Sequence, residues 1–172
     1  MRAGAIERRH LAEGVMSRAL YSPCETYRYL LERDWQPAAG RIAFVMLNPS
    51  TASEQRNDPT VERCERRARR LGFGGFTVVN LFAFRATRPA DLRRAEDPVG
   101  PENDAVLAQA IAAADLVLAA WGAHGAYRDA GARWAAAQRA SGQAMHHIGL
   151  TKDGHPRHPL YVPYAVAPQL WF

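Results

Sequence analysis

Residues 41–51, Arg-Ile-Ala-Phe-Val-Met-Leu-Asn-Pro-Ser-Thr, decide the predicted fold, because a continuous apolar run ends there in a sharp polar turn. The unbroken run over residues 42–47 predicts a strand that is buried on both faces, which is typical of parallel sheets. Residues 76–79 and 116–120 have the same form, and residues 145–150 make a weaker fourth run. Stretches with helical signals separate these runs, so we expect parallel neighbours joined by right-handed crossovers.

The order of these elements predicts an α/β fold, a three-layer α/β/α sandwich with a central four-stranded parallel sheet. Residues 21–27 have turn chemistry and lead into the alternating stretch 27–35, which predicts an N-terminal β-hairpin that caps an edge of the sheet. We assign residues 1–16 to an N-terminal arm and residues 17–172 to a single α/β domain, because a chain of 172 residues is large enough for one hydrophobic core and too small for two.

The positive charge of the chain comes almost entirely from arginine, since Lys152 is the only lysine among 22 basic residues and the formal net charge is +5. One interpretation is a compositional bias that spreads arginines over solvated faces. The other is contact with phosphate, because guanidinium groups match phosphate oxygens and basic surfaces attract nucleotides or nucleic acid. A cluster favours the second interpretation, and its members are Arg63, Arg66, Arg67, Arg69 and Arg70.

Several classes of protein are excluded by composition. No apolar stretch is long enough to cross a bilayer, and residues 1–15 do not resemble a signal peptide, so we expect a cytoplasmic protein with no membrane partner. The two cysteines, Cys24 and Cys64, supply neither a disulfide framework nor a paired metal spacing. No cofactor is predicted, and the oligomeric state is left open.

Polar clusters follow the ends of the predicted strands. In an open parallel sheet, ligands bind outside the carboxyl ends of the strands, so these clusters predict one shared site. The candidate catalytic residues are Asn48, Asp58 and His155. The candidate ligand-binding residues are Pro49, Ser50, Thr51, Asn80, Phe82, Arg85, Trp121, Gly122, His124, Arg157 and His158.

Long motifs within residues 17–161 allow a resemblance to be stated. They are Met46-Leu47-Asn48-Pro49-Ser50-Thr51, Asn57-Asp58-Pro59-Thr60, Val79-Asn80-Leu81-Phe82-Ala83, Gly100-Pro101-Glu102-Asn103-Asp104, Ala120-Trp121-Gly122-Ala123-His124-Gly125 and the segment Gly149 to Pro159. Through these motifs the chain resembles a bacterial and phage domain family of unknown function, the family numbered 1643. This resemblance implies no established activity.

A more distant resemblance is to the uracil-DNA glycosylase superfamily, whose members have a four-stranded parallel sheet and the same order of motifs. This resemblance implies that Asn48 with Pro49 ends the first strand and positions an attacking water, and that Asn80 reads the edge of a base. It also implies that Trp121 ends the third strand, and that His155 lies in a loop that polarises the base and approaches DNA.

The chemistry of glycosidic-bond cleavage is consistent with these roles. Cleavage builds negative charge on the departing base, so the protein needs a group that positions water and a donor to the developing anion. Asn48 can orient water but accepts protons poorly, so Asp58 is the nearest carboxylate that can act as a base. Arg157 is the best candidate for a phosphate contact. The best prediction is a hydrolase acting on the N-glycosidic bond of a nucleotide or nucleic acid. The alternative is a non-catalytic nucleotide- or nucleic-acid-binding module with the same pocket.

Each candidate also has a structural interpretation. Asn48 and Asn80 can end strands in ordinary turns, and Asp58 followed by a proline can cap a helix over residues 58–71. Trp121 and Phe82 can be packing residues of the core.

Two further observations limit the glycosylase interpretation. The first motif lacks the stacking aromatic residue and the aspartate that some members of the superfamily carry, and only Leu160 or Tyr161 is placed to wedge a duplex. A free nucleotide, a nucleoside or single-stranded nucleic acid is therefore favoured over duplex DNA. His124, His155 and His158 can instead hold a metal ion, but no carboxylate or cysteine falls at convincing ligand spacing, so no metal ligand is assigned.

Overall fold

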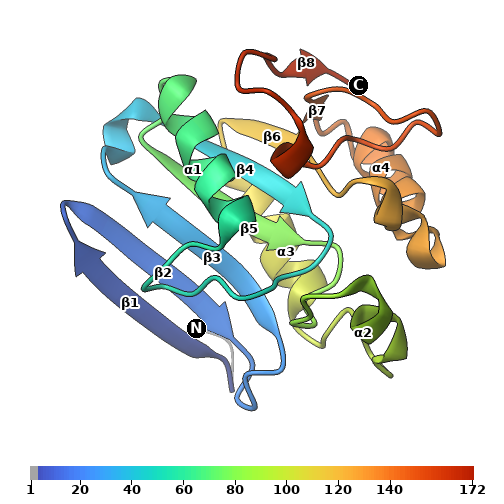
Figure 1. Cartoon of the computed structure of the whole chain (residues 1–172), viewed down its shortest axis with the longest axis horizontal. Helices are drawn as coiled ribbons and strands as arrows, with labels where there is room; N and C mark the ends of the chain where they lie inside the picture. The colour runs from blue at the N-terminus through green and yellow to red at the C-terminus, as the bar shows by residue number, and fades with distance from the viewer. Residues whose placement is uncertain (1–3) are drawn as a thin grey trace.

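Strands β4 (Arg41–Met46) and β5 (Gly75–Asn80) form the middle of a single eight-stranded sheet in the computed structural model, which describes residues 4–172 (Figure 1). The order of the sheet is β1-β2-β3-β5-β4-β6-β7-β8. The remaining strands are β1 (Ile6–Ala12), β2 (Val15–Tyr21), β3 (Arg28–Asp34), β6 (Leu116–Ala119), β7 (His146–His147) and β8 (Gln169–Leu170).

The predicted sandwich around a four-stranded parallel sheet is wrong, because the sheet is mixed and has twice as many strands. Among the described residues, β1, β2, β3 and β5 pair antiparallel in that order, as do β7 and β8, while only β5, β4, β6 and β7 run parallel. The predicted hairpin across residues 21–27 is present as β2 and β3, but it does not merely cap an edge. Leu31 lies opposite Val78, so β3 supplies the hydrogen bonds that the free side of β5 requires.

The ends of the chain also extend the sheet. Residues 6–12, which lie within the predicted arm, form β1 and pair along their whole length with β2. Residues 1–3 of that arm lie outside the described residues. The weak fourth run, residues 145–150, contributes only the two-residue strand β7, because Gly149 adopts φ +112° and the chain turns away there.

Helices cover both faces of the sheet. Helix α1 (Pro59–Arg70) lies on one face, while α2 (Pro89–Arg94), α3 (Asn103–Ala112) and α4 (Ala130–Ser141) lie on the other (Figure 1). Side chains of β4 alternate between these layers: Phe44 packs in the same cluster as Cys64 of α1, whereas Val45 packs in the cluster of Ile111 of α3. Three short 3-10 segments are η1 (Pro37–Ala39), η2 (Ala123–Asp129) and η3 (Pro159–Tyr161).

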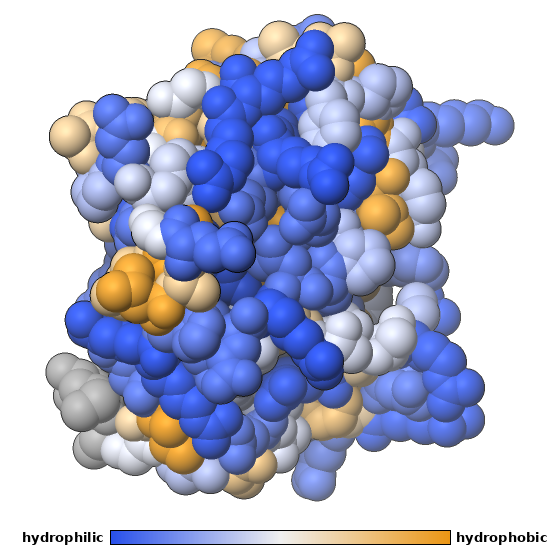
Figure 2. All heavy atoms as spheres, turned by 60° about the vertical axis from the view of Figure 1, so that its left-hand side comes forward, coloured by the Kyte–Doolittle hydropathy of each residue, from blue (hydrophilic) through white to orange (hydrophobic). Residues whose placement is uncertain are grey.

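The exposed edge strand β1 carries charged side chains beside one exposed apolar residue, Leu11. Arg8 and Arg9 are exposed, and Glu7 pairs with Arg9 at 2.6 Å. Charged side chains on an edge strand oppose pairing with a second chain. Figure 2 shows that the adjoining face is mostly hydrophilic, with apolar residues in small separate patches.

Parallel register places the carboxyl ends of the central strands side by side. Met46 of β4 lies opposite Asn80 of β5, and Val45 lies opposite Ala119 of β6. The polar clusters that follow these strands therefore begin at one edge of the sheet. Within residues 4–172, no helix has the length and apolar character needed to cross a membrane.

Candidate functional site

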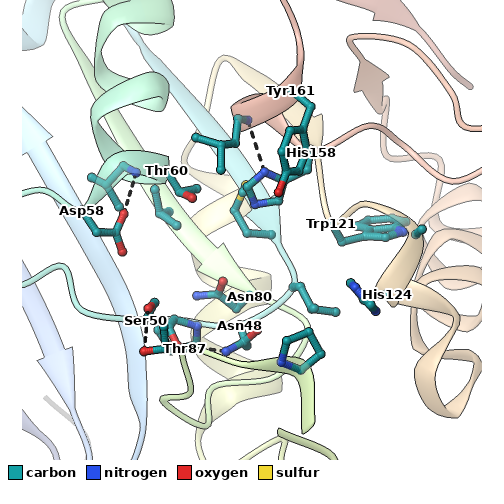
Figure 3. Close-up of a pocket in the computed structure, with 18 of the residues that line it drawn as sticks. Asn48, Ser50, Asp58, Thr60, Asn80, Thr87, Trp121, His124, His158 and Tyr161 are labelled. Atoms are coloured by element: carbon teal, nitrogen blue, oxygen red, sulfur yellow. Dashed lines mark hydrogen bonds between the residues drawn. The ribbon is translucent and has the colours of Figure 1, made fainter. Parts of the chain in front are cut away.

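A cavity of about 570 Å³ opens at the carboxyl ends of β4, β5 and β6 (Figure 3). Its walls come from segments that are distant in sequence: residues 46–50, the start of α1, the loop near Thr87, residues 121–124 and the segment 151–161. Figure 3 shows Asn80 in the middle of this ring of side chains, with Asp58 and Thr60 on one side and Trp121 and His124 on the other.

The cavity collects most of the candidate residues from the sequence. Those that line it are Asn48, Pro49, Ser50, Asp58, Asn80, Trp121, His124, Arg157 and His158. The structure thus brings together residues from all four predicted polar clusters.

Five candidates lie elsewhere. Thr51 is exposed outside the cavity, and Phe82 packs in the core against Tyr127. Arg85 donates to the Glu25 carbonyl, and His155 lines a second cavity of about 220 Å³ beside α4. Gly122 adopts φ +73° at the end of β6, where a Cβ atom would lie 3.3 Å from the Cβ of His158.

Asn80 has the least expected environment of the lining residues. Its side chain is only 1% exposed, and neither Nδ2 nor Oδ1 has a hydrogen-bond partner among the described residues. The backbone around it is well satisfied, since Asn103 Nδ2 donates to the carbonyls of Asn80 and Leu81 at 2.9 and 3.2 Å. A buried amide without partners is costly, so its presence at a cavity marks a group that is kept for a ligand or for ordered water.

Asn48 and Asp58 are both engaged by the backbone. Asn48 Nδ2 donates to the carbonyls of Pro49 and Ala86 at 3.0 and 2.7 Å. Asp58 caps α1 by accepting from Val61 N at 2.9 Å, and its second oxygen accepts from Ala52 N at 3.3 Å. The capping interpretation of Asp58 is therefore confirmed, and both of its oxygens already hold the first turn of α1 and the preceding loop.

His158 presents a neutral imidazole to the cavity. Burial lowers its pKa, while the negative charge of Asp58 acts in the opposite direction. His158 Nδ1 accepts a hydrogen bond from Leu160 N at 3.2 Å, so the neutral ring carries its proton on Nε2. The ring of Tyr161, which is 72% exposed, lies beside it with centroids 5.8 Å apart. A donor and an exposed aromatic face thus occupy the same rim.

Trp121 forms the wall between the two cavities. Its packing interpretation is confirmed, because its ring contacts Trp134 and Trp171 with centroids 5.8 and 5.9 Å apart. Its indole Nε1 has no hydrogen-bond partner within the described chain. Gly125 and Gly131 leave room for the ring, since a Cβ atom on Gly131 would lie 2.5 Å from Nε1.

Arg28 is the main site residue that the sequence did not predict. It is 2% exposed, comes from the start of β3, and lines the cavity. Its Nη1 donates to the Ala52 carbonyl at 2.8 Å, and burial lowers its pKa to about 10, so it stays charged at neutral pH. The only available signal was an arginine at the start of a strand, and its relevance depends on β3 joining the sheet. Other lining residues without a predicted role include Thr60, Thr87 and Thr151.

Four of the five arginines of α1 have structural partners. Arg63 donates to the carbonyls of Pro159 and Val162 at 3.1 and 2.6 Å, and Arg67 donates to the Val166 carbonyl at 2.8 Å. Arg66 and Arg69 form i,i+4 ion pairs along the same helix. These contacts hold residues 159–166 against α1 and keep η3 over the cavity. The arginine cluster therefore has partners within the protein and does not require a phosphate backbone as its partner.

A metal site at the histidines has no support in the geometry. Within the part of the chain that the structure describes, no group of three or more histidine, cysteine, aspartate or glutamate side chains could hold an ion. His155 lines the second cavity, whereas His124 and His158 line the first.

Comparison with known proteins yields one family. A family model described as "Protein of unknown function (DUF1643)" matches residues 28–160. No curated protein and no solved structure matches the chain. The likeness to the uracil-DNA glycosylase superfamily therefore stays a prediction.

Proposed function

This chain belongs to that family of unknown function, and from the chemistry of its site we propose that it binds a nucleobase-containing small molecule in the cavity beside Asn80. The observation that carries the proposal is the buried amide of Asn80, which has an unused donor and an unused acceptor side by side. Nucleobase edges offer adjacent donors and acceptors, so an amide can pair with them through two hydrogen bonds.

The cavity has the size and lining for such a ligand. Its volume of about 570 Å³ lies within the range of about 300–1,000 Å³ that is usual for small-molecule pockets. Tyr161 and His124 offer exposed aromatic rings at the rim, where a planar base can stack. His158 Nε2–H adds a donor to the same cavity, so polar groups converge from three sides.

Binding is favoured over hydrolysis by the state of the catalytic candidates. Asp58 gives both oxygens to backbone amides, Asn48 gives its nitrogen to backbone carbonyls, and His155 lies outside the cavity. A general base needs a free lone pair that faces the attacking water, and both oxygens of Asp58 are already held by backbone hydrogen bonds. A small ligand is favoured over nucleic acid because Arg63 and Arg67 are committed to residues 159–166.

The test is a binding screen of the purified protein against uracil, cytosine, adenine and guanine and their nucleosides and 5′-monophosphates. A ligand that binds the native state raises the melting temperature, and isothermal titration calorimetry then measures its affinity. We expect at least one of these compounds to bind the wild type, and Asn80→Leu to lose that binding.

Thr51→Ala is the control, because Thr51 directly follows the lining residues Asn48 to Ser50 but lies exposed outside the cavity. It should bind like the wild type. Failure of every compound to bind, or equal binding by Asn80→Leu, would refute the proposal. Release of free base from a bound nucleoside or nucleotide would replace it with the hydrolase prediction.

A further inference from the structure

We propose that Arg28 and the first turn of α1 form an anion subsite within this cavity, so that the ligand is a nucleotide phosphate rather than a free base or nucleoside. This inference rests on the proposed function and specifies its ligand. The anion subsite is defined as Arg28, Thr60 and Val61, all of which line the cavity.

The first support is the unusual state of Arg28. Among residues 4–172, no carboxylate lies within 4.0 Å of its guanidinium group, and its Nε has no hydrogen-bond partner. Within that same range, its one side-chain hydrogen bond runs from Nη1 to the Ala52 carbonyl. A buried cation is costly unless it is paired, and buried charges in proteins are normally paired or hydrogen-bonded. Asp58 attracts Arg28 only from beyond contact distance, and an arriving phosphate supplies a direct charge partner and acceptors.

The second support is the placement of α1. Thr60 and Val61 are the second and third residues of this helix of 12 residues, so its N-terminus opens on the cavity. Backbone N–H groups and the helix dipole favour an anion at that end. Val61 N is already used by Asp58, which leaves the turn around Thr60, with its N–H and hydroxyl, as the available donor group.

The charged side chains that line the cavity have a net positive charge, which favours an anion. Two guanidinium groups, Arg28 and Arg157, line it together with one carboxylate, Asp58. His158 also lines it but adds little positive charge at pH 7.5, because burial lowers the pKa of its imidazole. The Asp58 charge opposes an anion beside α1, so Arg28 must supply the attraction there.

Arg28 also has a structural role that the test must separate from anion binding. Arg33, on the same strand, is buried and donates to the Ser53 carbonyl at 2.5 Å, so both arginines hold the loop 52–57. Only Arg28 lines the cavity. Arg33→Lys is therefore a matched control for Arg28→Lys, since each change removes a fork of donors from the same loop.

The experiment measures affinities of uridine, cytidine, adenosine and guanosine and of their 5′-monophosphates by calorimetry at pH 7.5, for the wild type, Arg28→Met, Arg28→Lys and Arg33→Lys. In the wild type, a monophosphate should bind about tenfold to about a hundredfold more tightly than its nucleoside, which is the usual contribution of a charged hydrogen bond. Arg28→Met should lose this phosphate advantage and keep the nucleoside affinity. Arg28→Lys should retain part of the advantage, and Arg33→Lys should retain all of it.

Four results overturn the inference. Equal affinities of the wild type for a nucleoside and its monophosphate would refute the subsite and leave the proposed function intact. A phosphate advantage that persists in Arg28→Met would place the phosphate elsewhere, for instance at Arg157. A loss of affinity for nucleoside and monophosphate alike in both Arg28 variants would assign Arg28 to the loop alone. No binding of any compound would refute the proposed function and the subsite together.

Discussion

The partnerless amide of Asn80 predicts that removing it stabilises the protein while it abolishes ligand binding. Asn80→Leu replaces a buried amide with an apolar side chain of similar size. Each buried polar group without a partner costs about 1–3 kcal/mol, and Asn80 has two such atoms. Water in the cavity offsets part of this cost, because polar side chains line part of the cavity and it is large enough to hold water. We therefore expect the free energy of unfolding to rise by about 1 kcal/mol, or the melting temperature by roughly 2–4 °C.

Asn103 supplies the contrast, because it is also a buried asparagine but uses its amide nitrogen. Its Nδ2 donates to the carbonyls of Asn80 and Leu81. Asn103→Leu leaves these carbonyls without that donor and should lower the free energy of unfolding by about 1–3 kcal/mol per carbonyl. Urea denaturation of the wild type and both variants, followed by circular dichroism, measures the differences. If Asn80→Leu lost more than about 1 kcal/mol, the amide would be a structural group and the reasoning would fail.

Three other predictions concern Trp121, His158 and Cys24. Gly131→Ala should lower the free energy of unfolding by about 1–3 kcal/mol, because the new Cβ would meet the Trp121 indole. Helix propensity alone would raise it. A higher free energy of unfolding for this variant, measured by urea denaturation, would contradict the packing. Burial lowers the pKa values of His158 and His147 in the folded protein. Near and below pH 6.5 the unfolded chain therefore binds more protons than the folded chain, and the free energy of unfolding should decrease as the pH is lowered. NMR titration checks this, and a pKa of 6.5 or above for both rings would contradict it. A hydrogen bond from Ser22 lowers the pKa of the Cys24 thiol to about 7, so its alkylation by iodoacetamide should rise between pH 6 and 8 and then level off, whereas Ser22→Ala should shift that rise to higher pH. Buried Cys64 should react only after unfolding, and equal rates for the two thiols would contradict the structure.

The elements that the sequence predicted correctly depend on local signals. The apolar runs of β4, β5 and β6, and the helix start at Asp58 with its capping role, follow from periodicity and from turn and cap chemistry within a few residues. The position of Asn48, Asn80 and Trp121 at strand ends is equally local. Because parallel strands end at one edge of a sheet, the sequence alone was enough to predict that these three residues lie close together, and all three line one cavity.

The tertiary structure decided what depends on pairing between distant segments. Strand order is a non-local choice, so the sequence did not show that β3 continues the sheet and carries Arg28 to the cavity. The same holds for Arg63 and Arg67, whose carbonyl partners lie almost a hundred residues away. His155 and His158 look equivalent in sequence, but His155 pairs through its backbone with Thr151 and lines the cavity beside α4. Local chemistry thus determined which residues were polar and where strands stopped, whereas long-range hydrogen bonds and packing determined which of them share a site.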